Sequence, residues 1–247
     1  MSRYTKEEIL AKVDHTLLKP EATWPQVQAL CDEAMRWHTA SVCINTCYVR
    51  QAAEYMAGRV PVCCVVGFPL GAMDTASKCF EAKTAVENGA EEVDMVINIG
   101  RLKNKEYDAV REDIAAVKKA IGDKVLKVII ETCLLTEEEK IKMCDIVPEA
   151  GADFIKTSTG KIEPAATPEA AYVMCTAIKE YFAETGTKIG FKAAGGVSTV
   201  DDALTYYTIV REVLGESWIK EGLFRIGTSR LANLLVSDVL GEPVKPF

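Results

Sequence analysis

The sequence predicts an α/β fold, a single (β/α)8 TIM barrel with an extra helix at its N-terminus. A short β-rich run, a polar or glycine turn and an amphipathic helix follow one another eight times along the chain. Its length of 247 residues is close to that of a typical barrel of this class. No linker rich in glycine and serine divides the chain, so we expect one domain over residues 1–247.

The individual elements follow from apolar periodicity and from residues that start helices. An amphipathic stretch at residues 5–11 predicts the extra helix. Thr23, Thr136 and Thr167 each precede a predicted helix, and a threonine hydroxyl accepts a hydrogen bond from the first helical turn. The eight predicted strands cover residues 12–17, 40–44, 61–66, 92–97, 125–131, 152–156, 187–192 and 223–227. Such alternation predicts a parallel sheet covered by helices.

Charge and composition argue against several kinds of partner. The chain has 29 basic and 36 acidic residues, a net charge of -7, and no basic cluster that could follow a nucleic-acid backbone. We therefore expect no nucleic-acid partner and no anionic membrane surface. The first residues contain no apolar signal segment, and no run approaches the roughly 18 apolar residues of a membrane span. A cytoplasmic location is expected.

Cysteine and histidine usage gives little support to a metal site. The nine cysteines are an odd number without a disulfide spacing, and several lie in apolar runs, so reduced buried thiols are expected. Cys43 and Cys47 are separated by three residues, but no second pair follows them, and His15 and His38 are the only histidines. We predict no bound metal.

Two lysines give the main indication of chemistry. Lys156 and Lys192 end consecutive predicted strands, and a turn of small residues follows each. Neighbouring parallel strands lie about 4.8 Å apart, so the two ammonium groups would share one enclosed mouth and each would raise the cost of charging the other. One of the two could then be a neutral amine, which is the nucleophile of Schiff-base chemistry.

Two other predicted strands carry acidic side chains. Asp94 interrupts an apolar run, and it either forms a structural ion pair or faces both lysines and moves protons during the reaction. Asp14 and Thr16 share one side of their strand by period-two alternation, and we place them in the lumen as substrate contacts. His15, between them, is interpreted as a core histidine without a catalytic part.

Two further strand residues have open or minor roles. Cys43 would line the substrate pocket as wall and not as nucleophile. Lys127 also interrupts a strand, but the sequence does not fix its height in the barrel, and it could simply pair with a nearby acid.

Glycine and hydroxyl residues after the last three strands predict a phosphate site. Glycine lets the backbone approach an anion, and amides at the start of a helix point toward it. Each turn alone is also explained as a tight turn or a helix cap, but three in succession favour phosphate binding. The candidate residues are Thr159, Gly160, Lys161, Gly195, Gly196, Gly227 and Ser229.

Several motifs together resemble the deoxyribose-phosphate aldolase family. They include Asp14-His-Thr-Leu-Leu, Glu92-Val-Asp-Met-Val-Ile-Asn, Phe154-Ile-Lys-Thr-Ser-Thr-Gly and Phe191-Lys-Ala-Ala-Gly-Gly. The resemblance implies a class I aldolase of deoxyribose phosphate catabolism that cleaves 2-deoxy-D-ribose 5-phosphate into acetaldehyde and D-glyceraldehyde 3-phosphate. It implies that Lys156 forms the Schiff base, that Lys192 perturbs the pKa of Lys156, and that Asp94 transfers protons. No metal or organic cofactor is implied, the partners are small phosphorylated sugars and aldehydes, and a homodimer is a family-level expectation.

Three other functions compete with this interpretation. A metal-dependent aldolase would need several ligands at strand ends, which two histidines hardly provide. A phosphosugar isomerase usually needs one carboxylate base without paired lysines. A non-catalytic sugar-phosphate binder would have little need for charged groups placed inside a barrel.

Overall fold

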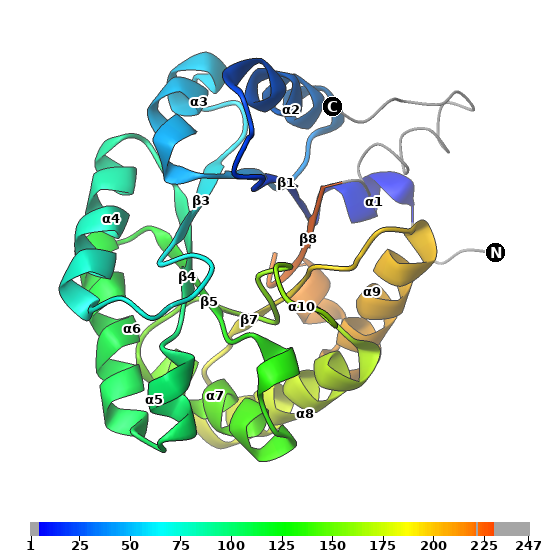
Figure 1. Cartoon of the computed structure of the whole chain (residues 1–247). Coiled ribbons are helices and arrows are strands. Elements are labelled where there is room, and N and C mark those ends of the chain that lie inside the picture. The colour runs from blue at the N-terminus through cyan, green and yellow to red at the C-terminus, as the bar shows by residue number, and fades with distance from the viewer. Residues whose placement is uncertain (1–4, 221, 230–247) are drawn as a thin grey trace.

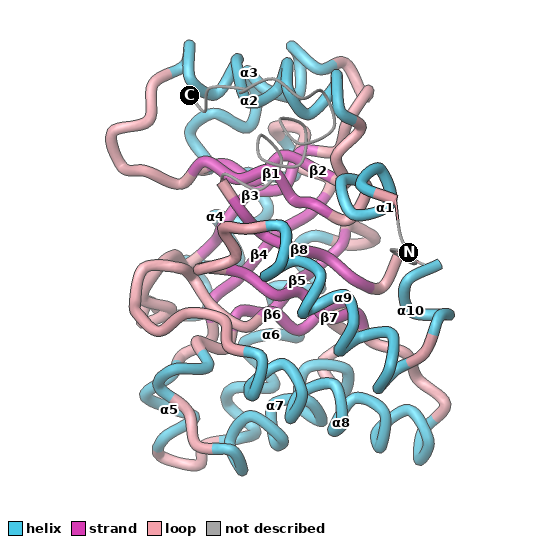
Figure 2. The backbone as a smooth tube through the Cα atoms, turned by 90° about the vertical axis from the view of Figure 1, so that its right-hand side faces the viewer, coloured by secondary structure: helices cyan, strands magenta, loops and turns pink. Residues whose placement is uncertain are grey.

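The chain folds into a closed barrel of eight parallel strands in the order β1-β2-β3-β4-β5-β6-β7-β8, in which β8 pairs with β1. This is a computed structural model, and it describes residues 5–220 and 222–229. Figure 1 looks into the barrel, and Figure 2 shows from the side that helices surround the strands. The predicted fold class is confirmed. The prediction that residues 1–247 form one domain stays a prediction.

The strands are short and almost wholly buried. They are β1 (Val13–Leu17), β2 (Ser41–Ile44), β3 (Val62–Val66), β4 (Glu92–Val96), β5 (Val125–Ile129), β6 (Phe154–Lys156), β7 (Gly190–Ala194) and β8 (Phe224–Thr228). The helices are α1 (Lys6–Leu10), α2 (Trp24–Trp37), α3 (Val49–Met56), α4 (Thr75–Glu87), α5 (Ile99–Lys103), α6 (Tyr107–Ile121), α7 (Glu137–Glu149), α8 (Pro168–Thr185), α9 (Val200–Leu214) and α10 (Glu216–Lys220), with single 3-10 turns η1 (Thr46–Tyr48) and η2 (Thr132–Leu134).

Helix starts follow the sequence closely. Thr23 and Thr136 form capping boxes with Gln26 and Glu139, and Thr167 accepts a hydrogen bond from the first turn of α8. The extra N-terminal helix is present as α1 and begins with a capping box of its own. None of the helices within the described residues is long and apolar enough to span a membrane.

Alternation along each strand divides the side chains between two environments. In β4, Val93 and Met95 point outward into the apolar layer under the helices. Glu92 and Asp94 point inward and contact charged groups of other strands. Since the strands are parallel, their carboxyl ends open at one face, and the loops that follow them form the rim of the site.

Strand β7 differs most from its predicted position, since it begins at Gly190 and not at residue 187. Gly186 ends α8 in a left-handed conformation, with φ of 72°, and residues 187–189 connect the helix to the barrel. The strand then continues to Ala193 and Ala194, which pair with Ile226 and Gly227 of β8. Small side chains that looked like a turn are part of the barrel wall.

Candidate active site

Two lysines and one carboxylate meet inside the barrel. Lys156 and Lys192 are register partners on β6 and β7. Their Nζ atoms lie 2.7 Å and 2.8 Å from the same oxygen, Oδ2 of Asp94 on β4. Lys156 is 3% exposed, and the other two residues are fully buried. The structure thus brings together the three residues that the sequence suggested for catalysis.

A second group of charges lies beside this triad. Lys127 contacts Oδ1 of Asp94 at 3.0 Å, forms a short ion pair with Glu92, and lies 3.7 Å from Asp14. Arg225 binds Asp14 at 2.8 Å and Glu92 at 3.0 Å. The two groups are joined by Lys192, whose Nζ lies 2.5 Å from Oδ2 of Asp14.

The charges in this network do not balance. If every group is ionised, three carboxylates face four cations, which leaves one surplus positive charge in a buried space. The carboxylates belong to Asp14, Glu92 and Asp94, and the cations to Lys127, Lys156, Lys192 and Arg225. A buried unpaired charge is costly, so the arrangement favours the loss of one proton from a lysine.

Electrostatics fix which groups stay charged. Burial alone would raise the pKa of Asp94, but the ammonium groups of Lys127, Lys156 and Lys192 outweigh it and hold that pKa well below its usual value. Burial would likewise lower the pKa of Lys192, but Asp14 and Asp94 outweigh it and raise that pKa above the usual range. Lys192 is therefore a stable ammonium group, and Asp94 is a stable carboxylate.

Lys156 is the cation with the fewest carboxylate partners. Its amine contacts Asp94 alone among the described residues, and it shares that carboxylate with Lys127 and Lys192. Lys192 has two carboxylate partners and so has Arg225. Of the four cations, Lys156 therefore has the least compensation from carboxylates.

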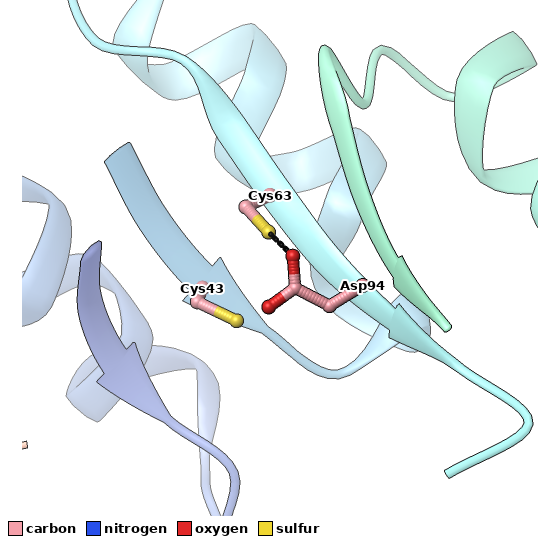
Figure 3. Close-up of side chains that lie close together, drawn as sticks. All are labelled: Cys43, Cys63 and Asp94. Atoms are coloured by element: carbon pink, nitrogen blue, oxygen red, sulfur yellow. Dashed lines mark hydrogen bonds between the residues drawn. The ribbon is translucent and has the colours of Figure 1, made fainter. Parts of the chain in front are cut away.

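Two thiols border the same carboxylate. Figure 3 shows Cys43 of β2 and Cys63 of β3 pointing toward Asp94. The two sulfur atoms and a carboxylate oxygen of Asp94 lie within 4.8 Å of one another, and such a group could in principle hold a metal ion. Cys63 donates to Oδ1 of Asp94 at 3.1 Å. A hydrogen bond with Cys63 lowers the pKa of Cys43, whereas burial raises the pKa of Cys63. Ammonium groups already occupy both oxygens of Asp94, so this cluster is a poor fit for a cation.

Cys43 also lies against an apolar wall. With Cys63 and Val65 it forms a small buried cluster, against which Leu18 and Phe68 pack from the rim. Its role as a wall of the substrate pocket stays a prediction. The other two predicted lumen residues, on β1, have internal partners, since Asp14 lies in the charge network and the Thr16 hydroxyl donates to the Asp14 carbonyl at 2.7 Å.

The predicted phosphate turns come close together at the rim. A Cβ on Gly195 would lie 2.8 Å from Cα of Gly160, so the loops after β6 and β7 touch, and only glycine allows this approach. Gly196 follows with φ of 77°. Lys161 reaches across the mouth and donates to the Leu18 carbonyl, after β1, at 2.8 Å.

The remaining phosphate candidates lie in different surroundings. Ser229 is an exposed residue in the bend after β8. Gly227 lies inside β8, where a Cβ would meet Cε of Lys192 at 3.0 Å, so it makes room for that lysine. The Thr159 hydroxyl donates to the carboxylate of Glu131 and accepts from the Lys161 amide.

Sequence reasoning missed part of the network. Glu92 and Arg225 received no role, and Lys127 was left open. A signal existed, because each is a charged residue within an apolar strand pattern, as in Leu223-Phe-Arg-Ile-Gly. His15 was interpreted correctly, since its ring is buried and lies 2.7 Å from Glu33 of α2, outside the lumen.

A closed barrel whose strands deliver ionisable side chains to one end is typical of an enzyme. The chain belongs to the DeoC/LacD family of aldolases, whose sequence model matches residues 9–214. It is 50% identical over 232 residues to the deoxyribose-phosphate aldolase of Clostridioides difficile (strain 630), which covers 94% of this chain and 97% of that protein.

Other relatives carry the same name. The deoxyribose-phosphate aldolase of Streptococcus pyogenes serotype M28 is 46% identical over 94% of this chain and 96% of its own length. The solved structure of deoxyribose phosphate aldolase from Aeropyrum pernix superposes with a TM-score of 0.78 at 28% identity, over 95% of this chain and 92% of that one.

Proposed function

We propose that this chain is a class I aldolase that reversibly cleaves 2-deoxy-D-ribose 5-phosphate into acetaldehyde and D-glyceraldehyde 3-phosphate through a Schiff base on Lys156. The relatives named above support the substrate. The observation that carries the mechanism is the contact of Lys156 and Lys192 with one Asp94 oxygen, inside a network that has one cation too many.

The surplus charge supports Lys156 as the nucleophile. An amine attacks a carbonyl only in its neutral form. Lys192 is held as an ammonium group by two carboxylates, whereas Lys156 has one shared carboxylate and is the only one of the two with any exposure at the mouth. Release of the Lys156 proton leaves three cations facing three carboxylates.

The reaction then proceeds in balanced steps. Neutral Lys156 adds to the substrate aldehyde and forms a carbinolamine, which loses water to give a protonated imine. The imine nitrogen accepts the electron pair of the C2–C3 bond as that bond breaks, and the hydroxyl on C3 loses its proton, which releases glyceraldehyde phosphate and leaves an enamine. Protonation of the enamine carbon and addition of water release acetaldehyde and regenerate the amine.

The proton transfers are assigned to Lys192 and Asp94. Lys192 is an ammonium group that can donate to the carbinolamine hydroxyl and later to the enamine. Asp94 touches both lysine nitrogens, so it can pass a proton between them. Its lowered pKa makes Asp94 a weak base by itself, and the carboxylate serves mainly to hold the two amines together.

The phosphate would bind at the rim where the glycine loops after β6 and β7 touch. Backbone amides of Gly160, Gly195 and Gly196 are the donors that this geometry offers, with the Lys161 ammonium group as a further one. Local amides and one lysine can hold an anion in an acidic protein, because charges beyond about 10 Å are screened.

Borohydride trapping tests the proposal. Borohydride in the presence of 2-deoxy-D-ribose 5-phosphate should reduce the imine and fix the substrate carbons on Lys156, as peptide mass analysis would show. Lys156→Ala should abolish both labelling and turnover, whereas Lys103→Ala, which removes a lysine paired with Glu139 on the surface, should change neither. Label on Lys192 would reverse the two roles, and turnover that a chelator abolishes without any label would reject the scheme.

The homodimer and the cytoplasmic location stay predictions from the sequence. Gel filtration with light scattering would decide the first of them.

A further inference from the structure

Glu131 has an unusual backbone conformation at the end of β5. It has φ of 55° and ψ of 68°, the left-handed region that non-glycine residues rarely adopt. Three other described non-glycine residues have positive φ, namely His38, Ala57 and Lys105, and all three are exposed. Glu131 is 1% exposed and lies at the carboxyl end of the barrel. Such a conformation costs free energy and persists where surrounding contacts require it.

The side-chain hydrogen bonds of Glu131 all go to one neighbour within the part of the chain that the structure describes. Its Oε1 accepts from the Thr159 backbone amide at 3.1 Å, and its Oε2 accepts from the Thr159 hydroxyl in a short hydrogen bond. That hydroxyl in turn accepts from the Lys161 amide at 3.0 Å. The two carboxylate oxygens therefore hold the first turn of the loop that follows the Lys156 strand.

Backbone contacts beside Glu131 join the same two loops. The Thr132 amide donates to the Thr157 carbonyl at 2.9 Å, and the Thr132 hydroxyl lies 3.3 Å from that of Ser158. Glu131 and its neighbour thus attach the end of β5 to residues 157–159. This segment carries Gly160 into its contact with Gly195, and it sends Lys161 across the mouth to Leu18.

We propose that Glu131 is a positioning residue, which holds the loop after β6, as a latch would, so that the Gly160 amide and the Lys161 ammonium group face the substrate phosphate. The inference rests on the proposed function and deepens it. Glu131 touches none of Lys156, Lys192 and Asp94 through any hydrogen bond or ion pair among the described residues. Its effect should therefore fall on the binding of the phosphate and spare the chemistry at the imine.

Substrates with and without phosphate separate these two effects. Glu131→Ala removes both acceptors and should raise the KM for 2-deoxy-D-ribose 5-phosphate roughly tenfold to a hundredfold, as expected for lost hydrogen bonds to a charged group. Its kcat, and its kcat/KM for unphosphorylated 2-deoxyribose, should stay within about threefold of wild type. Glu131→Gln keeps one acceptor oxygen and should recover most of the loss.

Two matched variants separate the latch from simpler effects. Glu169→Gln removes an exposed carboxylate from the first turn of α8, at the far end of the same loop, and should leave the KM unchanged. Lys105→Ala alters an exposed left-handed residue without a latch and should also leave it unchanged. An equal loss of kcat on both substrates in Glu131→Gln, or no change in the KM of Glu131→Ala, would overturn the proposal.

A readout that does not need turnover completes the test. Hydrogen exchange at the Thr159 and Lys161 amides should accelerate in Glu131→Ala, while exchange in α8 stays as in wild type. Binding of glycerol 3-phosphate, measured by calorimetry, should weaken in parallel. If wild-type protein binds this ligand but cleaves neither sugar, the proposed function fails and the latch stands. If exchange and binding are both unaltered in the variant, the latch fails whatever the activity.

Discussion

Lys192 has two effects on the charge balance of the site. Its ammonium group neutralises Asp14 and Asp94, and it also supplies the charge that makes four cations face three carboxylates. Replacement by a neutral side chain of similar size removes the surplus. The charge imbalance on which the proposed mechanism depends is then gone.

We therefore expect Lys192→Met to lose roughly 100-fold or more in kcat/KM near neutral pH, through loss of the neutral amine and of the proton donor. Part of the activity should return as the pH is raised, because hydroxide removes the proton that the second cation no longer displaces. Lys192→Arg keeps the charge, so its pH profile should stay near that of wild type even if its rate falls. If Lys192→Met has the same pH profile of kcat/KM as wild type, the charge argument is wrong.

Strand β8 contributes to the site through a missing side chain. Gly227 has no positive φ, so alanine is acceptable to its backbone. However, the added Cβ would lie 2.9 Å from Cβ of Ala194 and 3.0 Å from Cε of Lys192. Of these two contacts, Cε of Lys192 is the one that can move, because it lies near the end of a flexible side chain. A shift of about 1 Å at a reacting group can lower the rate roughly 100-fold.

Gly227→Ala should therefore fold and yet lose most of its kcat, with a smaller change in the KM. Gly100→Ala is the matched control, because Gly100 also lacks a positive φ and its Cβ would have 3.5 Å to the nearest atom. Steady-state kinetics beside urea unfolding of both variants would check this. If Gly227→Ala loses stability but turns over normally, β8 is structural wall and not part of the site.

The elements were predictable where local signals are strong. Threonine caps and apolar periodicity located α2, α7 and α8, because a hydroxyl that caps a first turn acts through neighbours in sequence. Strand ends were less certain, since Ala193 and Ala194 belong to β7 only through their pairing with β8. Pairing of that kind depends on closure of the barrel, which no local pattern encodes.

Site residues divide in the same way. Lys156, Lys192 and Asp94 could be selected because each ends or interrupts an apolar run. The contacts of Glu131 could not, since its partner Thr159 is 28 residues away and their meeting requires β5 and β6 to be neighbours. The pairing of Arg225 with Glu92 joins strands β8 and β4, which lie on opposite sides of the barrel.

Closure of the whole barrel encloses this charge network among buried side chains. Side chains of six strands contribute to it, and all of them except Arg225 are almost fully buried. A buried pair adds little over an apolar core, but the loss of one partner leaves an uncompensated charge. The stability of the molecule should therefore depend on pH through these groups.

The pKa shifts of the buried groups determine whether stability rises or falls with pH. Ammonium groups hold the pKa of Asp14 and of Asp94 below the ordinary value, against the effect of burial. In the acid range the unfolded chain binds protons that the folded chain does not, so this stabilisation is complete near neutral pH and is lost as the pH falls through the folded pKa values. The pKa of Lys192 is raised, so its contribution is complete below the ordinary lysine value and is lost only at higher pH.

Urea unfolding between about pH 7 and about pH 3 should show a free energy that falls by up to about 1.4 kcal/mol per pH unit for each such carboxylate. Asp94→Asn should lower the free energy of unfolding by about 3–5 kcal/mol at neutral pH, because three ammonium groups lose a shared partner. It should also make the decrease in this free energy at low pH less steep. Asp108→Asn is the control, because it removes an exposed carboxylate paired with Arg111. It should change the free energy of unfolding by less than about 1 kcal/mol and leave its decrease at low pH as steep as in wild type. If the decrease at low pH is as steep in Asp94→Asn as in wild type, surface carboxylates, and not the interior of the barrel, determine the stability of the molecule in acid.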